Sequence, residues 1–249
     1  MKIHQLSGYI QTIYLVEYDH GLLLLDGCCR CDVKIVLNFI LDTLKRPVTD
    51  LKTVVVTHMH PDHAGGAHKL RKILGCQIIT ANKEHHWYKG FNGILMHWID
   101  MLLSVYVGRK IKKGIKNVIY SRRLKADVQV KDGDQVPQFP EWQIMETPGH
   151  TDRDLSVWHQ QSNQIYVADL FIKLRSRFIC PFPIFHPNKY RASLYKVKQA
   201  KPNKVLLAHG GQLKMKNDDF NHLIQISPKI PRTPLRATIR KFKKITRRH

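Results

Sequence analysis

The chain has 249 residues and carries 41 lysines and arginines against 19 aspartates and glutamates, a formal net charge of +22. This length is enough for one domain whose core needs no disulfide staples, and no repeat or Gly/Ser-rich linker marks an internal boundary. The excess of positive charge argues against cationic partners and favours anionic ones, either nucleic acid or an acidic membrane surface.

The cysteines and the first residues point to a reducing compartment. The five cysteines are Cys28, Cys29, Cys31, Cys76 and Cys180. Their odd number and irregular spacing do not match the disulfide framework of a small secreted protein. The first eight residues lack the apolar core of a signal peptide, and no apolar run is long enough to span a bilayer. We therefore expect a cytoplasmic protein without a transmembrane segment.

Strand and helix patterns alternate in the first eighty residues. Strands are predicted at residues 10–18, 22–25, 53–57 and 77–80, and helices at residues 33–44 and 64–74. The strands are rich in β-branched and apolar residues, whereas the helices carry apolar residues at helical spacing. Gly75 follows the second helix, as expected of a left-handed C-terminal cap. The order of these elements predicts an α/β fold.

The loop after the strand at residues 53–57 is the most informative stretch of the chain. It places His58, His60, Asp62 and His63 within six positions. Three protonated imidazoles this close together would repel one another, whereas neutral imidazoles can share a divalent cation. This loop therefore predicts a metal site.

Residues 83–125 interrupt the alternating pattern. Residues 87–107 form a nearly continuous aromatic and aliphatic stretch, broken by His97 and Asp100. Two interpretations remain open: a helix packed against the domain, or a mobile helical lid over the metal site that favours an apolar substrate. A shallow membrane contact is a third, because five basic residues follow the stretch. They are Arg109, Lys110, Lys112, Lys113 and Lys116.

Further strands in the second half of the chain deliver three more candidate ligands. The predicted strands cover residues 126–136, 142–147, 155–159, 164–170 and 204–208, and a helix is predicted at about 189–200. His150, Asp169 and His209 lie at strand ends, as the first histidine loop does. We therefore expect all of these side chains to meet at one rim of the sheet structure.

The motif His58-x-His60-x-Asp62-His63 resembles the signature of the metallo-β-lactamase fold hydrolases. Three later motifs follow in that family's order: Thr147-Pro148-Gly149-His150-Thr151, Ala168-Asp169 and Ala208-His209-Gly210-Gly211. The resemblance runs from about Leu6 to Gly211. It implies an α/β fold, a four-layer αββα sandwich of two mixed β-sheets with the metal site at one rim. The domain would cover residues 1–228, with a helical insertion at about 83–125 and a basic C-terminal tail at 229–249.

The resemblance also implies a site for two divalent metal ions. His58, His60 and His150 would hold one ion, Asp62, His63 and His209 would hold the other, and Asp169 would bridge them. Zinc is the expected ion, with iron and manganese as alternatives. Asp62 would be the catalytic residue that orients the attacking water. Asp26 would orient a ligand histidine from behind, although a simple turn aspartate is the competing interpretation.

A metal-dependent hydrolase is the function that the resemblance implies. A metal-bridged hydroxide would attack a small-molecule acyl ester, thioester or lactone. The aspartate at position 169 and the absence of a large insertion between His150 and His209 favour this class over the lactamase and nucleic-acid-processing branches. Three alternatives stay open: a phosphodiesterase or nuclease, a mononuclear iron persulfide-type dioxygenase, and a metal-binding protein without catalysis. The basic tail could also bind an anionic partner, nucleic acid or an acidic membrane surface.

Overall fold

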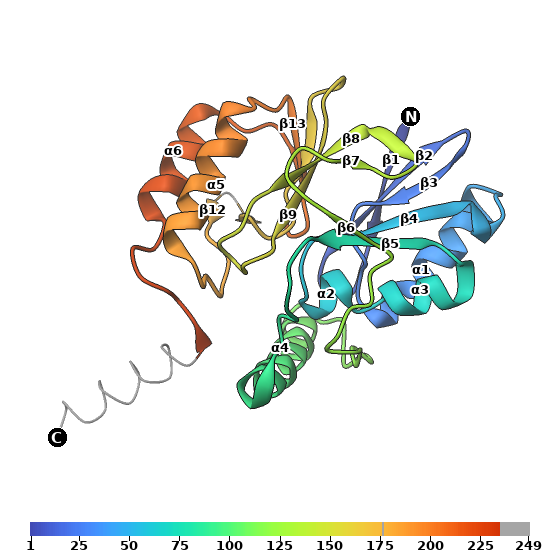
Figure 1. The fold of residues 1–249 in the computed structure, drawn as a ribbon, viewed down its shortest axis with the longest axis horizontal. Helices are drawn as coiled ribbons and strands as arrows, with labels where there is room; N and C mark the ends of the chain where they lie inside the picture. The colour runs from blue at the N-terminus through green and yellow to red at the C-terminus, as the bar shows by residue number, and fades with distance from the viewer. Residues whose placement is uncertain (176, 235–249) are drawn as a thin grey trace.

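Two six-stranded sheets pack face to face in the computed structural model, which describes residues 1–175 and 177–234 (Figure 1). The first sheet has the strand order β1-β2-β3-β4-β5-β6. Its strands are β1 (Lys2–Ser7), β2 (Thr12–Tyr18), β3 (Gly21–Leu24), β4 (Leu51–Val56), β5 (Gln77–Ala81) and β6 (Val128–Val130). The sheet is mixed, because β1 to β3 pair antiparallel whereas β3 to β6 pair parallel.

The second sheet is also mixed and has the order β14-β13-β10-β9-β8-β7. Its strands are β7 (Gln135–Val136), β8 (Phe139–Glu146), β9 (Leu155–His159), β10 (Gln164–Tyr166), β13 (Lys204–Leu207) and β14 (Gly211–Leu213). Only the pair of β10 and β13 is parallel among these described strands. A separate hairpin joins β11 (Ile172–Leu174) to β12 (Arg177–Ile179).

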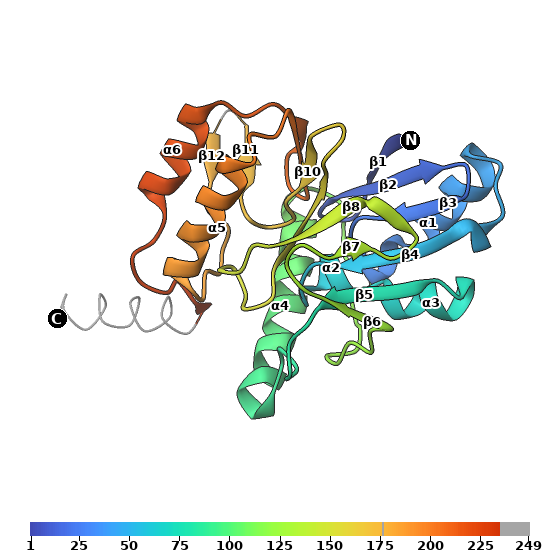
Figure 2. The same ribbon diagram turned by 45° about the horizontal axis from the view of Figure 1, so that its top comes forward.

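Helices cover the outer faces of both sheets (Figure 2). Helices α1 (Val33–Asn38) and α3 (Ala67–Leu74) lie on the first sheet, and α5 (Pro187–Gln199) and α6 (Asn217–Ile226) lie on the second. The short helix α2 (Pro61–Ala64) belongs to the histidine loop. The structure therefore confirms the four-layer αββα sandwich of two mixed sheets that the sequence predicts.

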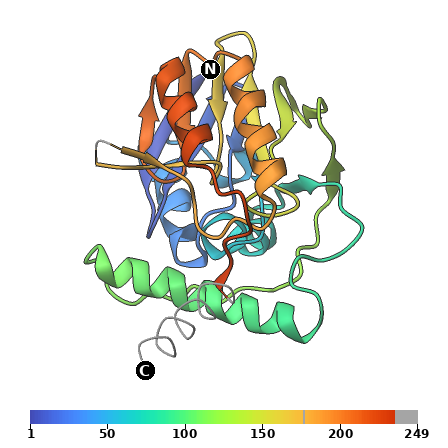
Figure 3. The same ribbon diagram turned by 90° about the vertical axis from the view of Figure 1, so that its left-hand side faces the viewer.

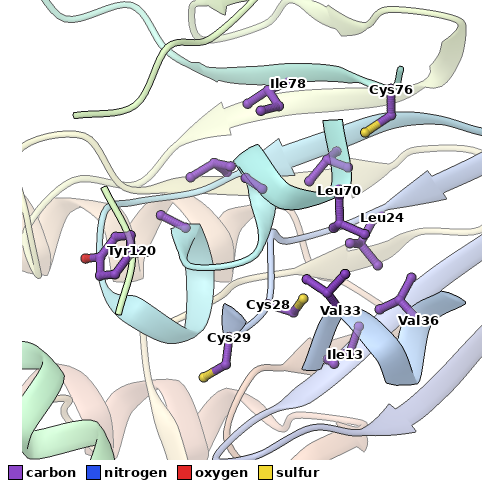
Figure 4. Close-up of a cluster of buried hydrophobic side chains, with 14 of the residues drawn as sticks. Ile13, Leu24, Cys28, Cys29, Val33, Val36, Leu70, Cys76, Ile78 and Tyr120 are labelled. Carbon is purple, nitrogen blue, oxygen red and sulfur yellow. The ribbon is translucent and has the colours of Figure 1, made fainter. Parts of the chain in front are cut away.

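Three hydrophobic cores lie between the four layers. Because successive side chains of a strand point to opposite faces of the sheet, each strand contributes residues to two of these cores. On β4, Val54 and Val56 face α1 and α3, whereas Val55 faces the second sheet. Figure 4 shows part of the outer core, where Leu24 lies near Leu70 of α3. The third core lies between the second sheet and its two helices. The sheets are thus fixed on both faces, which holds their ends in register.

Some element boundaries differ from the sequence prediction for local reasons. The helix expected at residues 33–44 is α1 followed by a π-helical turn at Phe39–Thr43. The helix expected at residues 64–74 breaks into α2 and α3 around Gly66, where an added Cβ would lie 2.7 Å from the Gly27 carbonyl. Gly75 has a φ of +71° and caps α3, as predicted. Strands β1, β11, β12 and β14 and helix α6 were not predicted, because they are short or weakly patterned.

Helix α4 (Gly90–Lys110) lies across one end of the sandwich, outside the four layers (Figure 3). One face of it is buried against the loops at that end. Among the described residues, no helix, α4 included, combines the length and the apolarity needed to cross a bilayer. Most of the predicted basic tail lies outside the described residues, which end at Pro234.

Candidate metal centre

The structure brings all seven predicted ligand positions together at one end of the sandwich. They form two groups, one of His58, His60, His150 and Asp169 and one of Asp62, His63 and His209. Within each group the candidate ligand atoms all lie within 4.8 Å of one another. The loops after β4, β8, β10 and β13 supply them, so both sheets contribute.

In the first group, three imidazole nitrogens converge. His60 Nδ1 lies 3.1 Å from His58 Nε2 and 2.9 Å from His150 Nε2. His150 Nδ1 lies 2.5 Å from the Pro183 carbonyl oxygen, which can only accept a hydrogen bond. His150 therefore carries its proton on Nδ1 and directs the lone pair of Nε2 toward the other two rings. Converging lone pairs of this kind fit a cation between them.

In the second group, one carboxylate and two imidazoles converge. Asp62 Oδ2 lies 3.4 Å from His63 Nε2 and 3.2 Å from His209 Nε2. His209 Nδ1 donates to the Ile10 carbonyl over 3.0 Å, and His63 Nδ1 donates to Asp26 Oδ2 over 2.6 Å. Both acceptors hold the proton on Nδ1, so both Nε2 atoms can direct a lone pair at a shared ion.

Asp169 turns one oxygen toward each group. Its Oδ2 lies 3.5 Å from His150 Nε2 and 3.9 Å from His58 Nε2. Its Oδ1 lies 3.4 Å from His63 Nε2 and 3.3 Å from His209 Nε2. Asp169 is thus the one carboxylate among these seven that could contact an ion in either group, which is the geometry that the predicted bridging role requires.

Unsatisfied buried atoms support the same fit. His63 Nε2 and Asp169 Oδ1 are fully buried and make no hydrogen bond to any described residue. Leaving such atoms unpaired costs free energy, about 1–3 kcal/mol each, so a native structure normally supplies a partner. Imidazole and carboxylate atoms are ligands that zinc, iron and manganese all accept. The residues present therefore fit one divalent cation in each group.

The pKa values of the histidines are lowered in the first group and raised in the second. Burial lowers the pKa of His58 and His150, and it lowers the pKa of His60 to about 4, so these rings are neutral at pH 7. Burial would also lower the pKa of His63 and His209, but neighbouring carboxylates outweigh it and raise the pKa of His209 to about 10. In the second group, a bound cation would therefore take the place of protons.

Asp26 lies behind the second group and contacts its histidine. Besides His63 Nδ1, its Oδ2 accepts from the Thr57 hydroxyl over 2.7 Å and from the Tyr166 hydroxyl over 2.9 Å. Its Oδ1 accepts from the backbone N–H groups of Thr57 and Gly27. The carboxylate thus does more than close a turn: it fixes the ring orientation of His63.

Sequence reasoning missed Asp100, which approaches the centre from α4. Asp100 is buried, and its Oδ2 lies 3.7 Å from His60 Nε2 and 2.9 Å from the Tyr88 hydroxyl. Burial raises the pKa of this carboxyl group to about 7. The hydroxyl of Tyr120 also reaches this region and donates to the Met59 carbonyl inside the histidine loop. One feature of the sequence could have pointed to Asp100: it is the only acid in the apolar stretch at residues 87–107. Since acids are rarely buried without a partner, an acid in such a stretch indicates a contact with a polar site.

A cleft of about 520 Å³ opens onto the centre. The side chains that line it include Asp62, Asp169 and His209 of the ligand groups, and Asp100. The remaining walls are largely apolar and come from α4 and the residues just after it, the β11–β12 hairpin, the loop that follows this hairpin, and the β1–β2 loop. The apolar lining residues include Leu103, Val107, Ile172, Leu174, Ile179 and Phe182. Helix α4 therefore forms a wall of the cleft.

Comparison with known proteins agrees with this fold and this site. The family model described as "Metallo-beta-lactamase superfamily" matches residues 6–209. The "Probable metallo-hydrolase YqjP" of Bacillus subtilis is 23% identical in an alignment of 219 residues that covers 80% of this chain and 66% of that protein. The "Hydroxyacylglutathione hydrolase" of Bdellovibrio bacteriovorus is 26% identical over 136 residues, 54% of this chain and 40% of that protein. Both alignments thus span less than two thirds of the relative.

A solved structure shows the same fold over nearly the whole chain. The archaeal metallo-beta-lactamase superfamily protein ST1585 from Sulfolobus tokodaii superposes with a TM-score of 0.65 at 19% identity, covering 91% of this chain and 86% of that one. The family model covers most of the present chain, and its match includes every candidate ligand. The chain therefore belongs to the metallo-beta-lactamase superfamily.

Proposed function

We propose that the chain is a metal-dependent hydrolase that cleaves an acyl ester, a thioester or a lactone. The observation that carries this proposal is the largely apolar cleft that Asp62, Asp169 and His209 also line. Such a cleft suits an uncharged acyl group next to the metal ligands. Two relatives of the chain are named hydrolases, and the name of one specifies a hydroxyacylglutathione.

The seven side chains would hold two divalent ions. His58, His60 and His150 would bind one, Asp62, His63 and His209 the other, and Asp169 would contact both; zinc is our first choice, with iron and manganese as alternatives. When bound, such ions supply Lewis acidity, which lowers the pKa of a water molecule and polarises a carbonyl oxygen.

Two carboxyl groups of the cleft have different proton affinities and therefore suit different tasks. Burial would raise the pKa of Asp62, but His63 and His209 hold it well below its usual range, so this carboxylate is an acceptor that orients a water. The pKa of Asp100, raised by burial to about 7, lets it keep a proton near neutral pH. We assign to Asp100 the delivery of that proton to the departing oxygen of an ester.

A phosphodiesterase is the second candidate, because the chain carries a charge of +22 and because Lys113 and Lys173 line the cleft. Cations next to a metal site favour a phosphate substrate. Lys113 is, however, already engaged by the Ser7 hydroxyl and the Gly8 carbonyl, and most of the cleft wall is apolar. We therefore rank the acyl substrates first.

Elemental analysis of the purified protein, paired with a panel of ester, thioester, lactone and phosphodiester substrates, tests the proposal. We expect about two metal ions per chain and turnover of an acyl substrate. The variants His58→Ala and Asp169→Ala should lose metal and turnover together, whereas the exposed His222→Ala should lose neither. Turnover of the phosphodiester alone would favour the second candidate. One iron per chain without hydrolysis would favour the dioxygenase, and full metal without any turnover would favour a binding protein.

A further inference from the structure

Helix α4 buries mostly small and polar side chains and exposes large apolar ones, the reverse of an ordinary surface helix. The face that it buries against the domain carries Gly93, His97, Asp100, Met101, Ser104 and Gly108. The opposite face carries a row of large apolar residues at helical spacing: Phe91, Leu95, Trp98, Leu102 and Tyr106, with exposed fractions of 81%, 53%, 52%, 66% and 60%. Single exposed apolar residues are common, but a contiguous row along one helix marks an interaction surface. We call this row the α4 stripe.

Exposed basic residues lie at both ends of the α4 stripe. Between residues 89 and 125 the sequence contains nine lysines and arginines and a single acid, Asp100. Because Asp100 is buried and faces the metal centre, no exposed acid offsets the positive charge in this segment. Arg109, Lys110 and Lys112 are exposed at the C-terminal end of the helix, and Lys89 is exposed at the other end.

We propose that the α4 stripe docks on the surface of a bilayer that contains anionic phospholipids. The apolar row would enter the boundary between headgroups and acyl chains, while the flanking lysines and arginines contact the phosphates. Trp98 and Tyr106 suit this depth, since aromatic side chains with a polar atom concentrate at membrane interfaces. A second copy of the chain fits less well, because pairing two α4 stripes would bring together the lysines and arginines at the ends of each helix.

The cleft opens next to this surface. Leu103 and Val107 of α4 line the cleft and are also 38% exposed, so the apolar wall continues onto the outer surface of the helix. Across the cleft, Leu174 and Phe182 are 58% and 51% exposed. A docked molecule would therefore present an apolar path from the bilayer to the metal ligands. Resting on the proposed function, this geometry assigns the substrate class: an acyl amphiphile that resides in the membrane.

Vesicle flotation of the full chain tests the docking step. We expect co-flotation with vesicles of phosphatidylcholine and phosphatidylglycerol, weaker binding to phosphatidylcholine alone, and weaker binding at high salt. The double variant Leu95→Asp/Leu102→Asp should reduce binding at least tenfold. The matched control is Leu41→Asp/Ile73→Asp, which places the same charges at residues that are each 48% exposed on another part of the surface and should bind like the wild type. Unchanged circular dichroism would show that both variants fold.

Substrate turnover separates docking from catalysis. Leu95 and Leu102 do not line the cleft, so the double variant should hydrolyse a soluble short-chain ester at the wild-type rate but lose at least tenfold on a long-chain ester embedded in the vesicles. Wild-type protein that stays unbound to anionic vesicles would overturn the docking proposal. So would a dimer, detected by sedimentation, that the double variant dissociates. Vesicle binding without turnover of any acyl substrate would support docking and refute the proposed function.

Discussion

Replacing Asp26 by asparagine tests whether this carboxylate positions the second ligand group. The substitution keeps the shape but turns one acceptor oxygen into an N–H₂ donor. Asp26 Oδ2 accepts from His63, Thr57 and Tyr166, and Oδ1 accepts from two backbone N–H groups. With the amide nitrogen in the Oδ1 position, the Thr57 N–H loses its acceptor, whereas the Gly27 N–H keeps the His63 carbonyl at 2.8 Å. For this one unpaired buried N–H, we expect a loss of about 1–3 kcal/mol in the free energy of unfolding of the metal-free protein.

The effect on metal binding should be confined to one group. His63 belongs to the second group, so its ion should bind roughly 10–100-fold more weakly, the range found when a partner of a ligand histidine is removed. Calorimetric titration with zinc should then show one tight and one weakened site, and urea unfolding of the metal-free form gives the stability. The exposed Asp42→Asn is the control. Two equally tight sites in Asp26→Asn would refute the positioning role.

Three further predictions follow from the same region. The pKa of His60 is about 4 in the folded metal-free chain and about 6.5 in the unfolded chain, so the unfolded chain binds a proton first as the pH falls. Acidification from pH 6.5 to 4 should therefore lower the free energy of unfolding, measured in urea, by about 3 kcal/mol. A free energy of unfolding that does not change with pH in this range would contradict the prediction. Asp100→Asn should slow hydrolysis of an alkyl ester roughly a hundredfold and a thioester far less, because a thiolate leaves without a proton; equal losses would exclude a proton donor. Gly149→Ala should destabilise the chain by more than about 2 kcal/mol and lower metal content, since its Cβ would lie 2.3 Å from Tyr190 Cα, whereas Gly75→Ala has open space and should keep its metal.

The candidate ligands could be predicted from the sequence because each follows a strong strand pattern. Val54–Val56 before the histidine loop and Val205–Leu207 before His209 are buried strand residues, so their ends had to meet at one rim. Asp100 could not be predicted as part of the centre. Its approach to His60 depends on how α4 docks, which is a contact between segments 40 residues apart in the sequence.

The face of α4 that is buried could not be predicted from the sequence pattern either. Apolar residues occur on most sides of this helix, so periodicity does not indicate which side is buried. A rule that turns apolar residues inward would have chosen the wrong face. The domain instead packs against Gly93, Ser104 and Gly108, whose small side chains allow close approach; at Gly108 an added Cβ would lie 2.0 Å from the Tyr9 hydroxyl.

The metal ligands come from both sheets, so a bound ion would stabilise the folded chain against unfolding. His58 and His60 follow β4 of one sheet, whereas His150 and His209 follow strands of the other, so an ion held between them acts as a cross-link. An ion that binds only the folded chain adds about 2.7 kcal/mol to the free energy of unfolding at a free concentration one hundred times its dissociation constant. Cellular proteases act on opened molecules. The half-life of this protein should therefore lengthen as free metal rises, independently of any substrate.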